Sequence, residues 1–303
     1  MDAVNEAICE MLPDAYTFRI PSHEPLSRRS YDFLGKSELC FIGGTNILGS
    51  PAWRLQWYDA FFLKNAICLG VSWAVSCNKP KLRDRLLLPR VLSGKGLHSV
   101  RDGYTKNLLA QLGIQSVSTS CPTMWKLTPE HCAVIPSTKA RDVVFTLTAY
   151  RANPVFDRAM IEILRRNYRR LYFFSQMSDD RRYIKQFDDH GVRVISPRLS
   201  AYDQFLANED VDYVGSRLHG GIRALQCKKR TVVMAVDHRS AEIGCDTGLP
   251  VLPRGEVNRL DEWVNGCAST QIRLPMADIA GWKSQFSGNL TTLCSANAIA
   301  DMI

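Results

Sequence analysis

The residues best suited to chemistry lie in the run Asp212-Tyr-Val-Gly-Ser-Arg-Leu-His-Gly-Gly-Ile-Arg-Ala-Leu225. The pattern predicts that a buried strand ends near Gly215 and that a helix begins near His219. A helix N-terminus presents unpaired backbone N–H groups and a partial positive charge, so it attracts anions. Arg217 and Arg223 add permanent positive charge, and His219 adds a group that titrates near neutral pH. The run therefore predicts a phosphate or carboxylate site with a proton donor beside it.

Each of these side chains also has a structural alternative. Arg217 can pair with a nearby carboxylate, and His219 can cap the helix without transferring a proton. In the functional interpretation, Arg217 neutralises a bound anion through a bidentate contact, and Gly220 and Arg223 lie beside the same anion. The helix dipole disfavours protonated His219, but a bound dianion restores that form, and His219 can then act as a general acid.

Further candidates follow other predicted strands, because ligands of parallel α/β proteins bind outside the carboxyl ends of the strands. They are Gly43, Gly44 and Asn46 after the strand 39–43, Arg101 and Asp102 after 94–100, Arg151 after 142–148, Ser175 after 170–175, and His238 after 230–236. Asp102 can accept a proton from a substrate hydroxyl or cap the helix that begins near Tyr104. Ser175 can bind phosphate, although ordinary loop polarity explains it equally well. His238 can reach the site or be a solvent-exposed loop residue.

Short apolar runs alternate with amphipathic segments along the chain. Besides the strands already given, strands are predicted at 66–73, 192–195 and 211–215, and helices at 104–112, 157–170, 179–190, 201–208 and from 219 onward. Strands that alternate with helices predict parallel sheets covered on both faces. We therefore expect an α/β protein with two Rossmann-like domains that face a cleft, the arrangement called GT-B among glycosyltransferases. The expected domains are residues 1–135 and 136–303. No Gly-x-Gly-x-x-Gly fingerprint or P-loop supports a dinucleotide or ATP site.

Composition is that of a globular protein of 303 residues with a net charge of +8, which favours anionic partners. The basic residues are scattered apart from Arg165, Arg166, Arg169 and Arg170, for which a solvated helix face is the simplest interpretation. Because basic residues do not cluster with aromatic ones along the sequence, we expect no nucleic-acid partner.

The ten cysteines form no Cys-x-x-Cys pair, so no metal site is expected. These features and the lack of an 18-residue apolar run favour a cytoplasmic location.

Three segments together resemble the polysaccharide pyruvyl transferases. They are Phe41-Ile-Gly-Gly-Thr-Asn-Ile-Leu48, which has Thr45 where the family has a third glycine, Ser99-Val-Arg-Asp followed by Leu-Gly-Ile114, and Ser216-Arg-Leu-His-Gly220. The segments occur in the family's order. Family members usually begin with a strand and a Gly-Asn-x-Gly-Asp-like loop, whereas residues 1–8 resemble only the end of that loop. The first domain is therefore expected to lack part of its first strand and loop.

The resemblance implies transfer of pyruvate from phosphoenolpyruvate, as the donor substrate, to a sugar of a bacterial surface polysaccharide or its precursor, as a cyclic ketal. It needs no other cofactor. His219 and Asp102 would be catalytic residues. The second domain would hold the donor through Arg217, Gly220, Arg223, Ser175, Arg151 and His238. The first domain would hold the acceptor through Gly43, Gly44, Asn46 and Arg101. The acceptor would be lipid-linked or nucleotide-linked, with peripheral contact at the inner membrane face.

Two other functions fit the same pattern. A GT-B glycosyltransferase would use the arginine and the helix start to hold the diphosphate of a nucleotide sugar. A non-catalytic binding protein would have kept the fold without the chemistry. Trp53, Trp57 and Tyr58, which follow the Gly43-Gly44 loop, can stack on a sugar ring or belong to the core.

Overall fold

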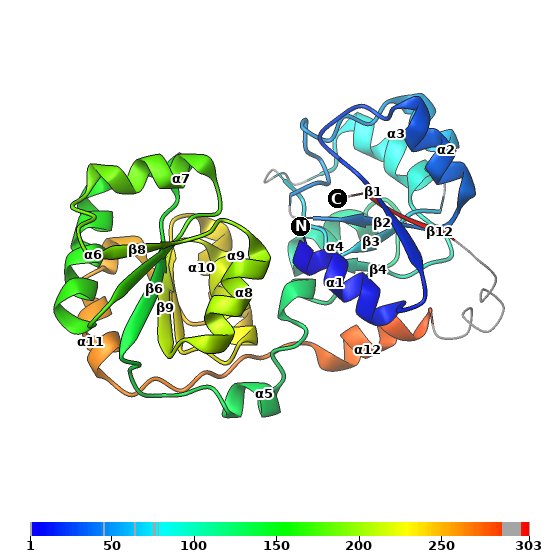
Figure 1. Ribbon diagram of the computed structural model, residues 1–303. Coiled ribbons are helices and arrows are strands. Elements are labelled where there is room, and N and C mark those ends of the chain that lie inside the picture. The colour runs from blue at the N-terminus through cyan, green and yellow to red at the C-terminus, as the bar shows by residue number, and fades with distance from the viewer. Residues whose placement is uncertain are drawn as a thin grey trace. The chain divides into compact units, whose positions relative to one another are not determined.

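The computed structural model describes residues 2–44, 46–63, 65–74, 77, 79–286 and the backbone of 298–302, without the side chains of residues 2, 3, 238 and 239. The chain forms two compact α/β units (Figure 1). Unit 1 comprises Met1–Trp125 and Pro275–Ile303, and unit 2 comprises Lys126–Leu274. The α/β class and the parallel sheets expected from the sequence are confirmed. No helix among the described residues is long and apolar enough to span a bilayer.

Unit 1 is built around a parallel sheet in the order β1-β12-β2-β3, beside a separate parallel pair of β4 and β5. Its strands are β1 (Tyr16–Ile20), β2 (Ser37–Gly43), β3 (Ile67–Leu69), β4 (His98–Val100), β5 (Ser116–Ser118) and β12 (Ala298–Met302). Its helices are α1 (Asp2–Met11), α2 (Arg28–Lys36), α3 (Leu82–Val91), α4 (Gly103–Ala110) and α12 (Met276–Ser284), with the 3₁₀ turns η1 (Trp57–Phe61) and η2 (Pro122–Met124).

The C-terminal segment returns to unit 1, which the sequence did not indicate. Strand β12 lies between β1 and β2 and pairs in parallel with both. In α12, Trp282 is fully buried, packs against Trp125 and donates from its indole Nε1 to the carbonyl oxygen of Leu97 at 2.8 Å. The predicted division at 135/136 is therefore corrected: residues 126–135 belong to unit 2, and residues from Pro275 onward belong to unit 1.

A buried histidine joins β3 to β4. The backbone N–H of Cys68 donates to Nδ1 of His98 at 3.1 Å, and Nε2 of His98 lies 2.9 Å from the carbonyl oxygen of Ser93. Because Nδ1 accepts a hydrogen bond, the ring proton belongs on Nε2, where it donates to Ser93. The neutral ring thus satisfies both neighbours, and a second proton on Nδ1 would break the bond to Cys68.

We expect His98 to make the protein less stable in mild acid. Burial lowers the pKa of His98 from its ordinary value of 6.5. A lowered pKa contributes stability that is present above pH 6.5 and is lost as the pH falls, by at most about 1.4 kcal/mol per pH unit. Urea unfolding at about pH 8 and about pH 5.5 should show this loss in the native protein and less of it in His98→Gln. An equal loss in both proteins would contradict the prediction.

Unit 2 has one parallel sheet in the order β11-β10-β9-β6-β7-β8. Its strands are β6 (Asp142–Thr146), β7 (Leu171–Phe174), β8 (Val192–Ile195), β9 (Val211–Gly215), β10 (Thr231–Ala235) and β11 (Val251–Pro253). Its helices are α5 (Pro129–Ala133), α6 (Pro154–Asn167), α7 (Ser178–Tyr183), α8 (Leu199–Asn208), α9 (Leu218–Gln226), α10 (His238–Thr247) and α11 (Arg259–Asn265), with the 3₁₀ turns η3 (Ala149–Arg151), η4 (Ile184–Gln186) and η5 (Arg254–Glu256).

Alternation of side chains along the strands explains why this sheet carries helices on both faces (Figure 1). Val143 and Phe145 of β6 belong to an apolar cluster that includes residues of α6 and α11. Val144, between them, belongs to the other cluster, which includes residues of α8 and α9. Both faces of the central strand are therefore apolar, and polar groups can approach the sheet only at the strand ends.

Candidate functional site

The sheet of unit 2 reverses its direction of growth between β6 and β9. From β6 the chain proceeds outward through β7 and β8, then returns to place β9 on the opposite side of β6, followed by β10 and β11. This is the Rossmann strand order, in which ligands bind in the crevice beyond the carboxyl ends of the two strands at the reversal. In unit 2 the residues that follow these two strands are Leu147 and Thr148 after β6, and Ser216 and Arg217 after β9.

Gly215 allows β6 and β9 to approach each other at this point. A Cβ atom at Gly215 would lie 2.3 Å from the Thr146 hydroxyl oxygen and 2.6 Å from the Thr146 backbone nitrogen. We expect Gly215→Ala to lower the free energy of unfolding by about 1–3 kcal/mol in urea titrations. Gly255→Ala is the matched control, because a Cβ atom there meets nothing within 4 Å. Equal stability of the two variants would contradict the expectation.

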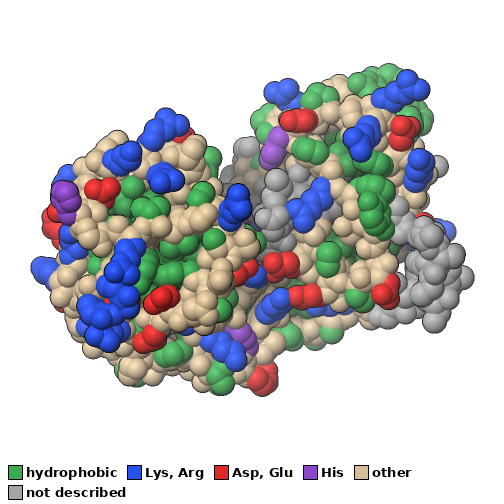
Figure 2. Space-filling model, viewed as in Figure 1, with side chains coloured by type: hydrophobic (Ala, Val, Ile, Leu, Met, Phe, Trp, Pro, Cys, Tyr) green, Lys and Arg blue, Asp and Glu red, His purple; other side chains and the backbone are tan. Residues whose placement is uncertain are grey.

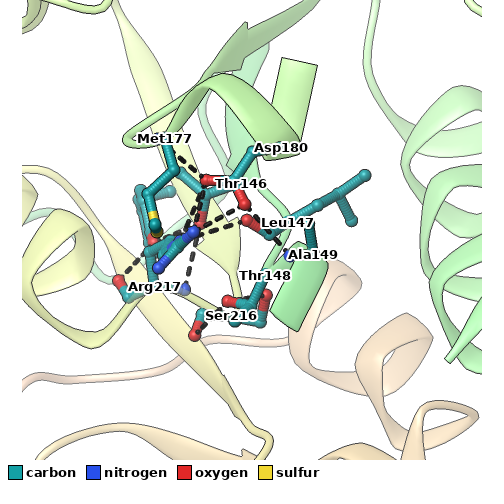
Figure 3. Close-up of polar contacts among 9 residues, drawn as sticks. Thr146, Leu147, Thr148, Ala149, Met177, Asp180, Ser216 and Arg217 are labelled. Carbon is teal, nitrogen blue, oxygen red and sulfur yellow. Dashed lines mark hydrogen bonds and ion pairs between the residues drawn. The ribbon is translucent and has the colours of Figure 1, made fainter. Parts of the chain in front are cut away.

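Arg217 is almost buried, with 8% of its surface exposed, and its guanidinium is paired. Nε and Nη2 of Arg217 donate to Oδ2 of Asp180 at 3.1 and 2.5 Å, and Nε also donates to the carbonyl oxygen of Leu147 at 3.2 Å. Its guanidinium carbon lies 5.0 Å from the centre of the Tyr150 ring. Figure 3 shows this side chain between the end of β6 and Asp180. The structural alternative raised for Arg217 is thus realised. Direct donor binding by Arg217 stays a prediction.

Asp180 is the residue of this site that the sequence interpretation missed. It is fully buried in α7, where Oδ1 accepts from the backbone N–H of Ala149 at 3.0 Å and Oδ2 from that of Met177 at 3.2 Å. Together with its bonds to Arg217, these contacts join the segments that follow β6, β7 and β9 (Figure 3). An acid in the first turn of a helix after a buried strand was the available signal. Its arginine partner, 37 residues later, could not be identified from spacing.

Helix α9 begins at the same place, and no side chain caps it. Its N-cap residue is Arg217, whose side chain makes no capping hydrogen bond. By contrast, the side chains of Asp102, Asn153 and Asp237 cap α4, α6 and α10. The first N–H groups of a helix have no partner within the helix, so an uncapped start can donate them to an anion. Helices α8 and α11 also lack a side-chain cap, but α9 begins at the reversal of the sheet, so its start is the better placed to hold phosphate or carboxylate.

His219 lies in the first turn of α9 and is exposed. Gly220 next to it is buried, and a Cβ atom there would lie 3.0 Å both from the Gln176 amide nitrogen and from the Tyr213 hydroxyl oxygen. That hydroxyl donates to the carbonyl oxygen of Arg217 at 2.7 Å, and burial raises the pKa of Tyr213, which keeps it protonated. The turn that carries His219 is thus packed against β9 and the segment after β7. The donor-side role of Gly220 stays a prediction.

The other predicted donor residues of unit 2 differ in their surroundings. Arg223 donates two hydrogen bonds of 2.7 Å to the carboxylate of Asp203 in α8. The side chain of Arg223 therefore links α9 to α8. Ser175 is buried, and Arg151 is exposed in η3, where its carbonyl oxygen accepts from Arg254. The side chain of His238 lies outside the described residues. Donor contacts by these four residues stay predictions.

The predicted acceptor residues and Asp102 all lie in unit 1. Gly43 ends β2, Gly44 has a positive φ of 108°, and the backbone N–H of Asn46 donates to the hydroxyl of Ser72 at 2.8 Å. Thr45 lies outside the described residues. Arg101 follows β4, half-buried.

Asp102 caps α4, with its carboxylate accepting from the backbone N–H of Thr105 at 2.7 Å. The capping alternative for Asp102 is therefore realised, and its catalytic role stays a prediction. Among the described residues, no group of three or more His, Cys, Asp or Glu side chains is arranged to hold a metal ion.

The order of the strands in unit 2, with a helix that begins at the reversal of the sheet, defines a Rossmann-like α/β protein. The family model of the polysaccharide pyruvyl transferases matches residues 1–238, and the chain belongs to this family. The family resemblance found in the sequence is thereby confirmed. A comparison with curated proteins found no match.

The comparison with solved structures found two proteins that were each determined with a uridine nucleotide. Methanocaldococcus jannaschii UDP-GlcNAc 2-epimerase, in complex with UDP-GlcNAc and UDP, is 11% identical with a TM-score of 0.50, over 88% of this chain and 79% of that chain. S. aureus MnaA with UDP is 10% identical with a TM-score of 0.49, over 97% of this chain and 88% of that chain. The likeness to the first shows a shared, GT-B-like fold.

Proposed function

We propose that this protein transfers the enolpyruvyl group of phosphoenolpyruvate to a sugar of a bacterial surface polysaccharide or its precursor. The product is a cyclic pyruvate ketal. Membership of the polysaccharide pyruvyl transferase family is the observation that carries the proposal. The uncapped start of α9, with an exposed histidine in its first turn, supports it as a place for an anionic donor next to a proton source.

In this reaction the methylene carbon of the donor takes a proton, and its central carbon becomes electrophilic. One sugar hydroxyl adds to that carbon, the bond to the phosphate oxygen breaks, and phosphate leaves. A second hydroxyl of the same sugar then closes the ring. The two hydroxyls lose two protons, of which the methylene carbon gains one and the departing phosphate the other. One sugar and one phosphoenolpyruvate thus give one ketal and one hydrogen phosphate.

His219 is proposed as the general acid that protonates the methylene carbon. Backbone N–H groups at the start of α9 would bind the phosphate or carboxylate. Because Asp180 already neutralises Arg217, we assign to Arg217 chiefly the positioning of this helix start. The protein would work at the inner face of the membrane, on a lipid-linked or nucleotide-linked acceptor.

The test uses isotopically labelled phosphoenolpyruvate and candidate glycan acceptors. We expect phosphate release only when acceptor is present, and mass spectrometry should find the pyruvate adduct on the acceptor. The competing function is glycosyl transfer from a nucleotide sugar. It is considered because the epimerase with a similar fold was solved with UDP-GlcNAc and UDP. Acceptor-dependent release of UDP from a nucleotide sugar, without any use of phosphoenolpyruvate, would overturn the proposal.

A further inference from the structure

Unit 1 carries a large exposed surface of aromatic and aliphatic side chains, here called the apolar patch. It consists of Trp57, Tyr58, Phe61 and Phe62 from η1 and the residue after it, and of Leu82 and Leu86 from α3. Their exposed fractions reach 74% for Trp57 and 71% for Leu82. Elements η1 and α3 contact each other. Side chains of this size are seldom exposed together on a soluble surface unless that surface binds something.

The fold itself turns these side chains outward. In η1 the buried residue is the acid Asp59, whose carboxylate accepts from the Tyr31 hydroxyl at 2.6 Å and from the backbone N–H of Gln56 at 2.7 Å. With Asp59 fixed inward, Trp57 and Phe61 are held outward. Such inversion of polar and apolar positions costs stability and indicates a functional surface.

Helix α3 shows the same arrangement on its outer side. Leu88 and Val91 face the core of unit 1, whereas Leu82 and Leu86, one turn apart, are exposed. The exposed pair cannot be explained by packing within the unit. It extends the aromatic surface of η1 with aliphatic side chains.

Within the segments 53–63 and 79–92, which carry the apolar patch, every exposed charge of the described residues is positive. The exposed cations are Arg54, Lys79, Lys81, Arg83, Arg85 and Arg90. The two acids of these segments, Asp59 and Asp84, are buried. Figure 2 shows hydrophobic and basic side chains next to one another over the part of unit 1 that carries α2 and α3. Basic and aromatic side chains that are separated along the sequence are thus brought near one another by the contact between η1 and α3.

We propose that the apolar patch and its cations dock unit 1 on an anionic phospholipid membrane. Tryptophan, phenylalanine and leucine side chains enter the boundary between headgroups and acyl chains, while lysine and arginine bind the acidic headgroups. This inference rests on the geometry of unit 1 and does not depend on the proposed reaction. Under the proposed function, the protein would then meet its acceptor at a lipid surface.

Single-stranded nucleic acid is another anionic partner that binds aromatic and basic surfaces. The geometry of the apolar patch disfavours it. Base stacking needs rings with open faces in series. Here the rings of Tyr58 and Phe61 meet that of Trp57 edge to face, at interplanar angles of 79° and 76°. Leu82 and Leu86 offer bases no stacking surface. Both features suit insertion among lipids better.

The test is co-sedimentation of the whole protein with vesicles of phosphatidylcholine alone or mixed with phosphatidylglycerol. We expect binding to the mixed vesicles, little binding to the neutral ones, and weaker binding as salt is raised. Charge reversal by Lys81→Glu with Arg85→Glu should lower partition about 10-fold or more. The matched control is Lys185→Glu with Arg193→Glu, two exposed cations of unit 2.

The apolar contribution is tested separately. Trp57→Ser with Phe61→Ser should lower partition about 10-fold or more, whereas Val155→Ser, at a site 74% exposed in unit 2, should not. The docking proposal is overturned if mixed vesicles do not bind, or if control and patch variants behave alike. It is also overturned if the patch variants no longer bind a fluorescent single-stranded oligonucleotide or a soluble glycan but still bind the vesicles. Failure of pyruvyl transfer with normal vesicle binding would count against the proposed function alone.

Discussion

Asp180→Ala is expected to lower the free energy of unfolding by about 3–5 kcal/mol, because it leaves the guanidinium of Arg217 buried without its charged partner. It also removes the acceptor for the backbone N–H groups of Ala149 and Met177. Urea unfolding monitored by circular dichroism measures the change. Asp180→Asn keeps the size of the side chain and one acceptor oxygen, so it should lower the free energy of unfolding by less than Asp180→Ala does.

Asp179 provides a control one residue away. It also pairs with an arginine, Arg182, but the two side chains are 58% and 78% exposed. Exposed pairs of this kind contribute about 0–1 kcal/mol, so Asp179→Ala should change stability little. If Asp179→Ala and Asp180→Ala were equally stable, the buried pair would not organise the loops at the carboxyl edge of the sheet.

The second large effect is expected on turnover. His219→Ala should lower kcat about 10²-fold or more if the imidazole supplies the proton to the donor. Because His219 is exposed, the urea midpoint of the variant should stay that of the native protein. The measurement is acceptor-dependent phosphate release at saturating donor and acceptor.

His190→Ala is the matched control, since His190 is also exposed in unit 2. An undiminished kcat in His219→Ala would assign the proton to another group. A loss of kcat accompanied by a lower unfolding midpoint would instead show that His219 acts on the fold.

Local patterns predicted unit 2 well. The β6 and β9 strands are apolar on both faces, and each is followed by a helix, so their position in a parallel sheet could be predicted from the residues alone. The start of α9 at Leu218 follows from the same pattern. The loop after β2 was likewise placed correctly.

Contacts between distant residues could not be predicted. The charge of Arg217 indicated an anion site, but its actual anion is Asp180, supplied by another helix. Strand β12 is short, and no local feature indicated that it would enter the sheet between β1 and β2. Similarly, η1 and α3 are about twenty residues apart, so the apolar patch exists only after folding brings them together.

The position of β12 has a consequence for synthesis on the ribosome. All of unit 2 leaves the exit tunnel before β12 does, and its residues are contiguous, so it can fold while translation continues. Unit 1 emerges before unit 2, but β1 and β2 gain the strand that lies between them only when Ala298–Met302 arrives. The part of the protein made earliest is therefore the part completed latest, and its nascent form is the one that most needs protection by chaperones.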